Sequence, residues 1–242
     1  MIEAIERATL DAMPPQRLEQ WGEWLLPYDD GTVGRSHSAV PLQHGTPPSG
    51  TLCELERRYR EQDLALVLRL PESAAFEGLR AQLGAQGYRR TRPTLVQVGT
   101  LDALASPHAA VGEIEVTERP GADWEQVFLG EGFDPVDGAS RLAILRRGQQ
   151  SVFAGLRVDG RIVAVGSACV RHGWCGLHGM RTLPAWRGKG CASALIAALG
   201  RAARERGAAQ CFLQVDASNA AARSLYAQRG FATAWAYAYW QR

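Results

Sequence analysis

The chain has 242 residues, 46% of them hydrophobic and 21% charged, which is ordinary for a soluble globular protein and allows one large domain or two small ones. Its net charge of +2, with acids and bases mixed throughout, excludes the electrostatic footprint of a nucleic-acid-binding protein. No apolar run approaches the ~18 residues that span a bilayer, and residues 1–13 lack the apolar block of a signal peptide. We therefore expect a cytoplasmic protein that binds neither nucleic acid nor membrane.

The cysteines and histidines predict neither disulfides nor a metal site. The five cysteines are an odd number, and no CxxC pair occurs. The nearest approach to a metal cluster is His172, Cys175 and His178, which lie around an expected hairpin turn without a matching second cluster. We interpret them as turn histidines and a buried thiol, and we expect no metal.

The first half of the chain alternates strand and helix patterns. Residues 23–28 and 32–40 are expected to form a hairpin around the DDGT turn. The elements that follow are a helix over 51–62, a strand over 64–70, a helix over 73–87 and a strand over 94–101. Residues 102–112 are small, contain Pro and Gly and show no periodicity, so we expect a linker there.

The second half gives a clearer pattern. A short strand over 114–119 precedes helical spacing over 122–147, which GEGFDPVDG at 130–138 interrupts. Residues 151–160 and 161–170 are strands joined by an Asp-Gly turn, the strongest short hairpin signal. The remaining elements are a strand over 174–183, a helix that ends at Gly207, a strand over 210–216, a helix over 218–230 and a strand over 231–240.

The order β, β, α, β, α, β occurs in both halves, which indicates a diverged internal duplication. We expect a first domain at residues 1–108 and a second at residues 109–242. The halves differ where a strand leads into a helix: residues 39–50 (AVPLQHGTPPSG) contain no lysine or arginine, whereas residues 182–190 (TLPAWRGKG) are basic and glycine-rich. If the halves correspond, only the second has a basic glycine loop.

This loop has the features of an anion site. A helix N-terminus leaves its first N–H groups without partners and carries about half a positive charge. Here no Ser, Thr, Asp or Asn precedes the helix as a cap; the entry contains Arg187, Gly188, Gly190 and Lys189, the only lysine among the 27 basic residues. Glycines let a ligand approach the backbone closely. We predict that the N–H groups of residues 187–192 bind an anion.

Two common phosphate motifs do not fit. A P-loop requires Ser or Thr after its Gly-Lys pair, and Gly190 stands there. A dinucleotide fingerprint requires a third glycine at the position of Ser193. The pattern Arg-x-x-Gly-x-Ala at 187–192, between a strand and a helix, resembles the pyrophosphate loop of the GNAT superfamily of acyl-CoA-dependent N-acetyltransferases. LQVDASNAAARSLYAQRGF at 213–231 is similar to the second motif of that superfamily.

The resemblance covers residues 112–242, and the first half resembles the N-terminal domains attached to some GNAT enzymes. It implies an α/β (α+β) fold with a mixed, mainly antiparallel sheet flanked by helices, in two tandem GNAT-like domains, the first without a phosphate loop. It also implies acetyl-CoA as cosubstrate. The implied cofactor-binding residues are Met180, Arg181 and Thr182 for the pantetheine arm, Arg187, Gly188, Lys189, Gly190, Cys191 and Ala192 for the diphosphate, and Asn219 for the pantetheine amides.

The resemblance further implies that the strand over 210–216 diverges from the strand before it and leaves a slot for the thioester. Tyr226 would protonate the leaving thiolate, and a phenol of pKa ~10 is a competent donor to a thiolate whose conjugate acid is near ~8.5. Three alternatives stay open. Tyr226 can be a core aromatic, Asn219 a helix cap unless Ser218 supplies it, and Cys191 a packed thiol instead of a nucleophile.

The general base is not identified, because the strand over 174–182 carries no carboxylate where many relatives have one. His178 has a suitable pKa range, although strand alternation could turn it away from the slot. Glu131, Asp134 and Asp137 either receive a cationic acceptor or form a solvated acidic loop. A water chain to solvent is a further route for the proton.

Two functions fit these patterns. One is an N-acetyltransferase for a small-molecule or peptide amine, and the other is a non-catalytic acyl-CoA-sensing or partner-binding module that lacks a base. The first half would cover one side of the catalytic sheet, help wall the acceptor site or build a homodimer.

Overall fold

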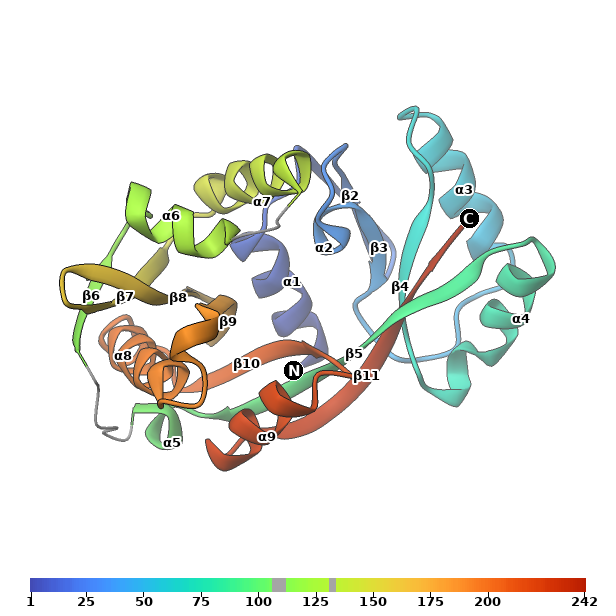
Figure 1. Cartoon of the computed structure of the whole chain (residues 1–242). Helices are drawn as coiled ribbons and strands as arrows, with labels where there is room; N and C mark the ends of the chain where they lie inside the picture. Colours follow the sequence, from blue (N-terminus) through green and yellow to red (C-terminus); the bar gives the residue numbers. More distant parts are fainter. Residues whose placement is uncertain (106–111, 131–133) are drawn as a thin grey trace.

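Eleven strands form one sheet in the computed structural model, which describes residues 1–105, 112–130 and 134–242. The strand order is β1-β2-β3-β4-β11-β5-β10-β9-β8-β7-β6 (Figure 1). All neighbouring pairs are antiparallel except β3 with β4 and β9 with β10. This is the mixed, mainly antiparallel α/β architecture expected from the sequence.

The first half contains the expected elements together with several that the sequence patterns did not indicate. Its elements are α1 (Ile2–Ala12), β1 (Arg17–Trp21), β2 (Trp24–Tyr28), α2 (Gly34–His37), β3 (Ser38–Pro41), α3 (Thr51–Arg60), β4 (Val67–Pro71), the 3-10 turn η1 (Ala74–Phe76), α4 (Glu77–Ala85), β5 (Arg89–Thr100) and α5 (Leu101–Ala105).

Two expectations for this half are revised. The expected pairing of residues 23–28 with 32–40 is present only at one end, where Leu25 pairs with Val40, because residues 34–37 form the helical turn α2 before β3 begins. The strand β2 also forms a hairpin with β1, which the sequence analysis did not predict. Residues 102–105 of the expected linker lie in the helix α5, whose Leu101 and Leu104 are buried against α8. The remaining linker residues 106–111 lie outside the described part of the chain.

The second half matches the expected order. Its elements are β6 (Glu113–Thr117), α6 (Ala122–Leu129), α7 (Pro135–Arg147), β7 (Ser151–Val158), β8 (Arg161–Arg171), β9 (Trp174–Thr182), the 3-10 turn η2 (Pro184–Trp186), α8 (Cys191–Glu205), β10 (Gln210–Asp216), α9 (Ala220–Gln228) and β11 (Ala232–Gln241). The Asp-Gly turn between β7 and β8 has positive φ at both Asp159 and Gly160, as a two-residue hairpin loop requires.

The topology confirms two tandem units. Each unit contains two parallel strands joined through one helix. In the first unit α3 connects β3 to β4, and in the second unit α8 connects β9 to β10. Both helices begin after a left-handed glycine, Gly50 with φ 82° and Gly190 with φ 77°. The final strands are exchanged, because β5 pairs with β10 of the second unit and β11 pairs with β4 of the first. The boundary between residues 108 and 109 stays a prediction.

Helices cover both faces of the sheet around β9 and β10. On one face the apolar side of α8, with Leu195, Ile196 and Leu199, packs in a core with Leu177 and Leu213. On the other face α1 lies over β8 and β9 (Figure 1), and its Ile5 and Ala8 share a core with Trp174 and Phe212. The N-terminal helix therefore covers the sheet of the second unit. No helix in the described ranges is long and apolar enough to cross a membrane.

Candidate functional site

The strands β9 and β10 separate halfway along their length. Their parallel pairing runs from Trp174 with Gln210 to Leu177 with Leu213 and then stops. We call this point the fork. Beyond it β9 bulges against β8, with a register shift opposite Val165 and Ser167 and with φ 63° at Gly179. Bulges end pairing and redirect a strand. The divergence expected between these two strands is therefore present, and the thioester slot stays a prediction.

A cavity of about 900 Å³ extends along β9 and the turn that follows it. It brings together five of the predicted cofactor-binding residues, although they come from three separate elements. Its lining consists of Val127, Gly130, Met180, Arg181, Thr182, Leu183, Pro184, Ala185, Trp186, Arg187, Asn219 and Ala221. The volume lies in the range of small-molecule and cofactor sites. We call this cavity the groove.

The loop at the N-terminus of α8 offers backbone donors beside the groove. Gly188 and Gly190 both have positive φ, and Gly190 precedes α8 without a side-chain cap. Within the described residues, no hydrogen bond engages the N–H groups of Gly188, Lys189, Gly190 or Ala192. The prediction for residues 187–192 is corrected at one position, because the Arg187 N–H donates to the Pro184 carbonyl at 3.3 Å. The other amides match an anion site.

Basic side chains surround these amides. The Lys189 ammonium lies 4.6 Å from the centre of the Trp186 ring, and the Arg187 Nε donates to the Thr182 carbonyl at 3.4 Å. Arg181 is half-buried and donates to the Leu129 carbonyl. Burial lowers the pKa of Arg181, and the nearby charges of Arg141 and Arg187 lower it further. This mutual repulsion identifies a positive region that an anion would neutralise.

Tyr226 lies in the core between α9 and α8. It is 9% exposed, its ring stands edge-on to that of Phe231, and it shares a core with Leu177 and Leu213 at the fork. It does not line the groove itself. Burial raises the pKa of Tyr226, so the phenol keeps its proton across the physiological range. The packing matches the interpretation as a core aromatic, and its role as an acid stays a prediction.

Asn219 caps α9. Its side-chain oxygen accepts a hydrogen bond from the Ala222 N–H at 3.0 Å, as the helix-cap interpretation expected. The alternative cap by Ser218 is wrong, because the Ser218 hydroxyl bonds to Asp216. The side-chain NH2 of Asn219 has no hydrogen-bond partner within the described residues, and this exposed residue lines the groove. Capping and cofactor binding are therefore compatible, since they use different atoms.

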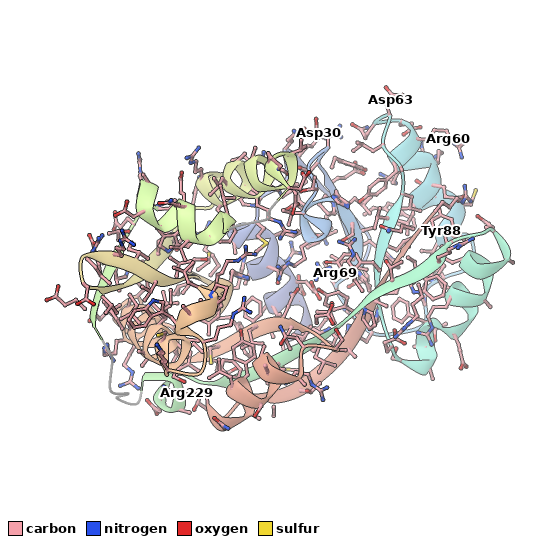
Figure 2. The ribbon with its side chains drawn as sticks, viewed as in Figure 1. Asp30, Arg60, Asp63, Arg69, Tyr88 and Arg229 are labelled. Carbon is pink, nitrogen blue, oxygen red and sulfur yellow. The ribbon has the colours of Figure 1, made fainter. Side chains whose placement is uncertain are left out.

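The two helices beside the groove are tied together by one arginine. Arg229, at the end of α9, donates to the Ser193 carbonyl in the first turn of α8 at 2.9 Å (Figure 2). Cys191, in the same turn, is 2% exposed, and burial raises the pKa of its thiol. A buried thiol that keeps its proton is a packing group and not a nucleophile.

The structure argues against His178 as a general base. The residue is 4% exposed and faces Phe212 on the side of α1, whereas Tyr226 lies on the side of α8. Burial, and then the charge of Arg35, lower the pKa of His178 to about 3. A group of that pKa cannot hold a proton taken from an ammonium near neutral pH. Its two ring nitrogens have no hydrogen-bond partner among the described residues.

The acidic loop before α7 has structural roles. Asp134 caps α7 by accepting from the Asp137 N–H, and Asp137 pairs with Arg141 and bonds Thr32. The carboxylate of Asp137 is therefore already paired, whereas exposed Asp134 uses only one carboxylate oxygen for the cap, and a role of Asp134 toward a cationic acceptor stays a prediction. Glu131 lies outside the described residues.

The sequence analysis did not predict a polar pair that the structure places at the fork. Arg35 Nη1 donates to Gln214 Oε1 at 3.3 Å, and Gln214 is the first residue of β10 beyond the paired segment. The signal for Gln214 was a polar residue inside an otherwise apolar central strand. No sequence signal placed Arg35 there, because it comes from the first unit.

The equivalent positions of the first unit differ from those of the second. The Thr51 N–H after the left-handed Gly50 donates to the Pro48 carbonyl, so the first amide of α3 is already used. The last turns of α4 and α9 match, since Tyr88 N bonds Leu83 O as Phe231 N bonds Tyr226 O. Leu83 therefore stands where the second unit has its tyrosine.

Comparisons with known proteins agree with this geometry. The family described as "Probable histone acetyltransferase Rv0428c C-terminal" matches residues 1–240. The chain is 26% identical over 234 residues to an uncharacterized N-acetyltransferase, YobR, of Bacillus subtilis, covering 95% of this chain and 94% of that protein.

Two solved structures share the fold. A GCN5-related N-acetyltransferase from Kribbella flavida superimposes with a TM-score of 0.72 at 19% identity, over 100% of this chain and 95% of the other. A tandem GNAT protein from the clavulanic acid biosynthesis pathway gives 0.65 at 16% identity, over 98% and 87%. The second match has the tandem arrangement inferred from the strand order.

Proposed function

The chain belongs to the Rv0428c C-terminal family of GNAT N-acetyltransferases, and on that premise we propose that it transfers an acetyl group from acetyl-CoA to an amine of a small molecule or peptide. The observation that carries the proposal is the set of unpaired N–H groups at Gly188, Lys189, Gly190 and Ala192 beside the groove. Donors of this kind suit a diphosphate.

The residues present fit acetyl-CoA. The amides of the loop, with Arg187 and Lys189, would hold the diphosphate. The backbone of Met180 to Thr182 loses its pairing with β10 beyond the fork, so it is available to the pantetheine amides. The Asn219 NH2 is a further donor at the groove. Acetyl-CoA supplies the activated acyl group as a thioester.

The chemistry requires no covalent enzyme intermediate. The neutral amine nitrogen forms a bond to the acyl carbon while the carbon–sulfur bond breaks, and the products are an amide and the free thiol of CoA. The one proton released overall is the proton that the acceptor ammonium loses beforehand. Tyr226 would donate its proton to the departing sulfur and later recover one from solvent, because its raised pKa keeps it protonated beforehand. The buried Cys191 has no part in these steps.

The proton of the acceptor ammonium would leave through water. The described strand β9 carries no carboxylate, and His178 is too weak a base. Deprotonation in solution would then make the rate depend on the fraction of neutral amine, which rises with pH up to the pKa of the acceptor.

Calorimetry with acetyl-CoA tests this function. We expect binding at tens of micromolar or tighter, and we expect the double variant R187A/K189A to weaken it on the order of tenfold to a hundredfold. Arg201→Ala, an exposed arginine further along α8, is the matched control and should bind as wild type. Absence of binding by the wild-type protein would remove the proposal.

The absence of an identified base on β9 favours a second candidate, a non-catalytic acyl-CoA sensor. A broad amine panel with detection of released thiol separates the two, since steady release with any amine excludes pure sensing. The cytoplasmic location and a homodimer stay predictions from the sequence.

A further inference from the structure

Two arginines of the first unit converge on the fork from the side of α1. Arg35, on α2, reaches Gln214, the residue at which β10 leaves β9. Gln214 is held from two other directions, because its Oε1 also accepts from the Tyr237 hydroxyl at 2.8 Å and its Nε2 donates to the Thr9 hydroxyl at 2.9 Å. These bonds fix the guanidinium of Arg35 where the slot opens toward α1.

An irregularity in the sheet places Arg92 beside α2, the helix that carries Arg35. The register of β5 with β11 shifts between Tyr237 and Tyr239, and Arg92 adopts φ 47° in the extra segment. Positive φ is uncommon for a residue with a side chain and costs conformational energy. The guanidinium of Arg92 stacks on Tyr239, 4.2 Å from the centre of its ring. It also lies close to Gly34, because a Cβ atom added to that glycine would be 3.2 Å from Arg92 Nη1.

Neither arginine has a carboxylate within ion-pair distance among the described residues. Burial, and then the charge of Arg35, lower the pKa of His178, and burial lowers that of His37, where the opposing charges of Arg92 and Asp29 act in addition. Glu6 attracts Arg35 but is itself buried and paired at 2.6 Å with another base, Arg69. Of the other acids, Asp29 pairs with Arg147 and Asp137 with Arg141, whereas Asp216 accepts hydrogen bonds from Ser218 and keeps its charge.

Arg35 is partly buried and Arg92 is exposed. Two cations of different elements, held by a bulge and a glutamine at the mouth of the slot, are an arrangement for binding an anion. We propose that Arg35 and Arg92 bind a carboxylate or phosphate group of the acceptor, so that the substrates are small amines carrying such an anion and not basic peptides. This inference rests on the proposed function and specifies its acceptor.

The physical reason is charge complementarity. A basic peptide would place like charges against the two arginines, which is destabilising, whereas a planar carboxylate or a phosphate matches the guanidinium donors. The amine of such an acceptor would lie on the open side of the fork, opposite Tyr226. The first unit would then determine the acceptor although it has no phosphate loop of its own.

Matched acceptor pairs test the inference. Each pair joins an amine that carries an anionic group to its counterpart without that group: tyrosine with tyramine, phenylalanine with phenethylamine, and phosphoethanolamine with ethanolamine. A lysine-rich peptide with a blocked N-terminus is the contrary probe. We expect kcat/KM, from thiol release with saturating acetyl-CoA, to favour the anionic member on the order of tenfold to a hundredfold. The first two pairs report a carboxylate and the third a phosphate.

Variants identify the residues. R35Q and R92Q should each abolish most of the preference, mainly through KM, while R35K should retain part of it because the charge remains. Arg89→Gln, an exposed arginine at the start of β5, is the matched control and should keep the preference. Thermal melts of each variant check the fold, and R92Q keeps the test valid if R35Q is unstable.

The outcomes separate this inference from the proposed function. Failure to bind acetyl-CoA rejects the function. Binding with equal turnover of both members, or preference for the lysine-rich peptide, overturns the anion site and leaves the function standing. If no amine is turned over, calorimetric titration of the same pairs into the CoA complex decides. The site is supported if the wild-type protein binds the anionic member of a pair more tightly than its counterpart and R92Q removes this difference. Equal binding of the two members, or no binding of either, contradicts the site.

Discussion

Tyr226 shows how one residue can satisfy both a packing and a catalytic interpretation. It is 9% exposed and shares a core with Leu177 and Leu213, yet these two residues mark the fork at which the thioester would lie. The resemblance to the second GNAT motif identified the tyrosine. Its burial and raised pKa depend on α8, which packs from elsewhere in the chain, so the sequence could not supply them.

Replacement of Tyr226 by phenylalanine should lower kcat by about 100-fold and leave acetyl-CoA affinity unchanged, because a general acid acts only in the transition state. Since activity requires the protonated phenol and burial raises its pKa, the wild-type kcat should not decline between pH 8 and 9.5. Stopped-flow turnover and calorimetry measure the two parts. Lost affinity with unchanged kcat would contradict the role.

His178 should make the protein less stable as the pH falls. An unfolded histidine has a pKa near 6.5, whereas burial, and then Arg35, lower the folded-state pKa to about 3. Between these values the unfolded state binds the extra proton, so the free energy of unfolding falls by up to about 1.4 kcal/mol per pH unit. Glu6, whose pKa is raised by burial, contributes with the opposite sign.

H178Q should therefore flatten the slope of unfolding free energy between pH 6 and pH 5 by about 1 kcal/mol per unit. Urea unfolding of wild type and variant at pH 5, 6 and 7 measures the difference, in which the contribution of Glu6 cancels. Equal slopes would show that His178 is not buried in its neutral form.

Helices and strands could be predicted from the sequence where a short local motif, such as a turn or a glycine loop, marks their ends. The Asp-Gly hairpin of β7 and β8 and the glycine loop before α8 rest on short-range rules, and the structure contains both. The sequence analysis predicted no element over residues 2–12, where the structure has the helix α1. The face on which His178 lies could not be read from β9 alone, since α1 and Phe212 bury it from distant parts of the chain.

The helix α1 is joined to the first unit by a buried ion pair. Glu6 and Arg69 of β4 are 2% and 1% exposed and lie 2.6 Å apart, and Figure 2 shows Arg69 in the interior between the units. Removing one member leaves the other charged and buried. Glu6→Ala should therefore destabilise the fold by about 3 to 5 kcal/mol, and the double variant E6M/R69M should cost less than that.

Urea unfolding of both variants provides the measurement. Arg90→Met, which removes the exposed pair with Glu72, is the control and should change stability by less than about 1 kcal/mol. A double variant that is less stable than Glu6→Ala would show that the pair contributes net stability.

For the whole molecule, the reciprocal exchange of β5 and β11 is the feature that the sequence did not reveal. The duplication was visible as a repeated order of elements. The partner of each final strand was not, because an apolar strand pairs equally well with several edges and long-range pairing leaves no local signature. The consequence is that neither unit has a complete sheet without the other.

The fragment of residues 109–242 should accordingly be insoluble or unfolded, since β10 would lose β5 and β11 would lose β4. Coexpression with residues 1–108 should recover soluble complex. Size-exclusion chromatography and circular dichroism report the outcome. A folded 109–242 monomer with full acetyl-CoA affinity would show that the exchange is dispensable.

The central claim is that the N–H groups of Gly188, Gly190 and Ala192 bind the diphosphate of acetyl-CoA. A crystal structure of the complex tests it most directly. The account predicts diphosphate oxygens about 2.7 to 3.2 Å from these nitrogens, with the pantetheine arm along Met180 to Thr182. A coenzyme bound elsewhere, or a loop whose amides are occupied by the protein's own atoms, would contradict it.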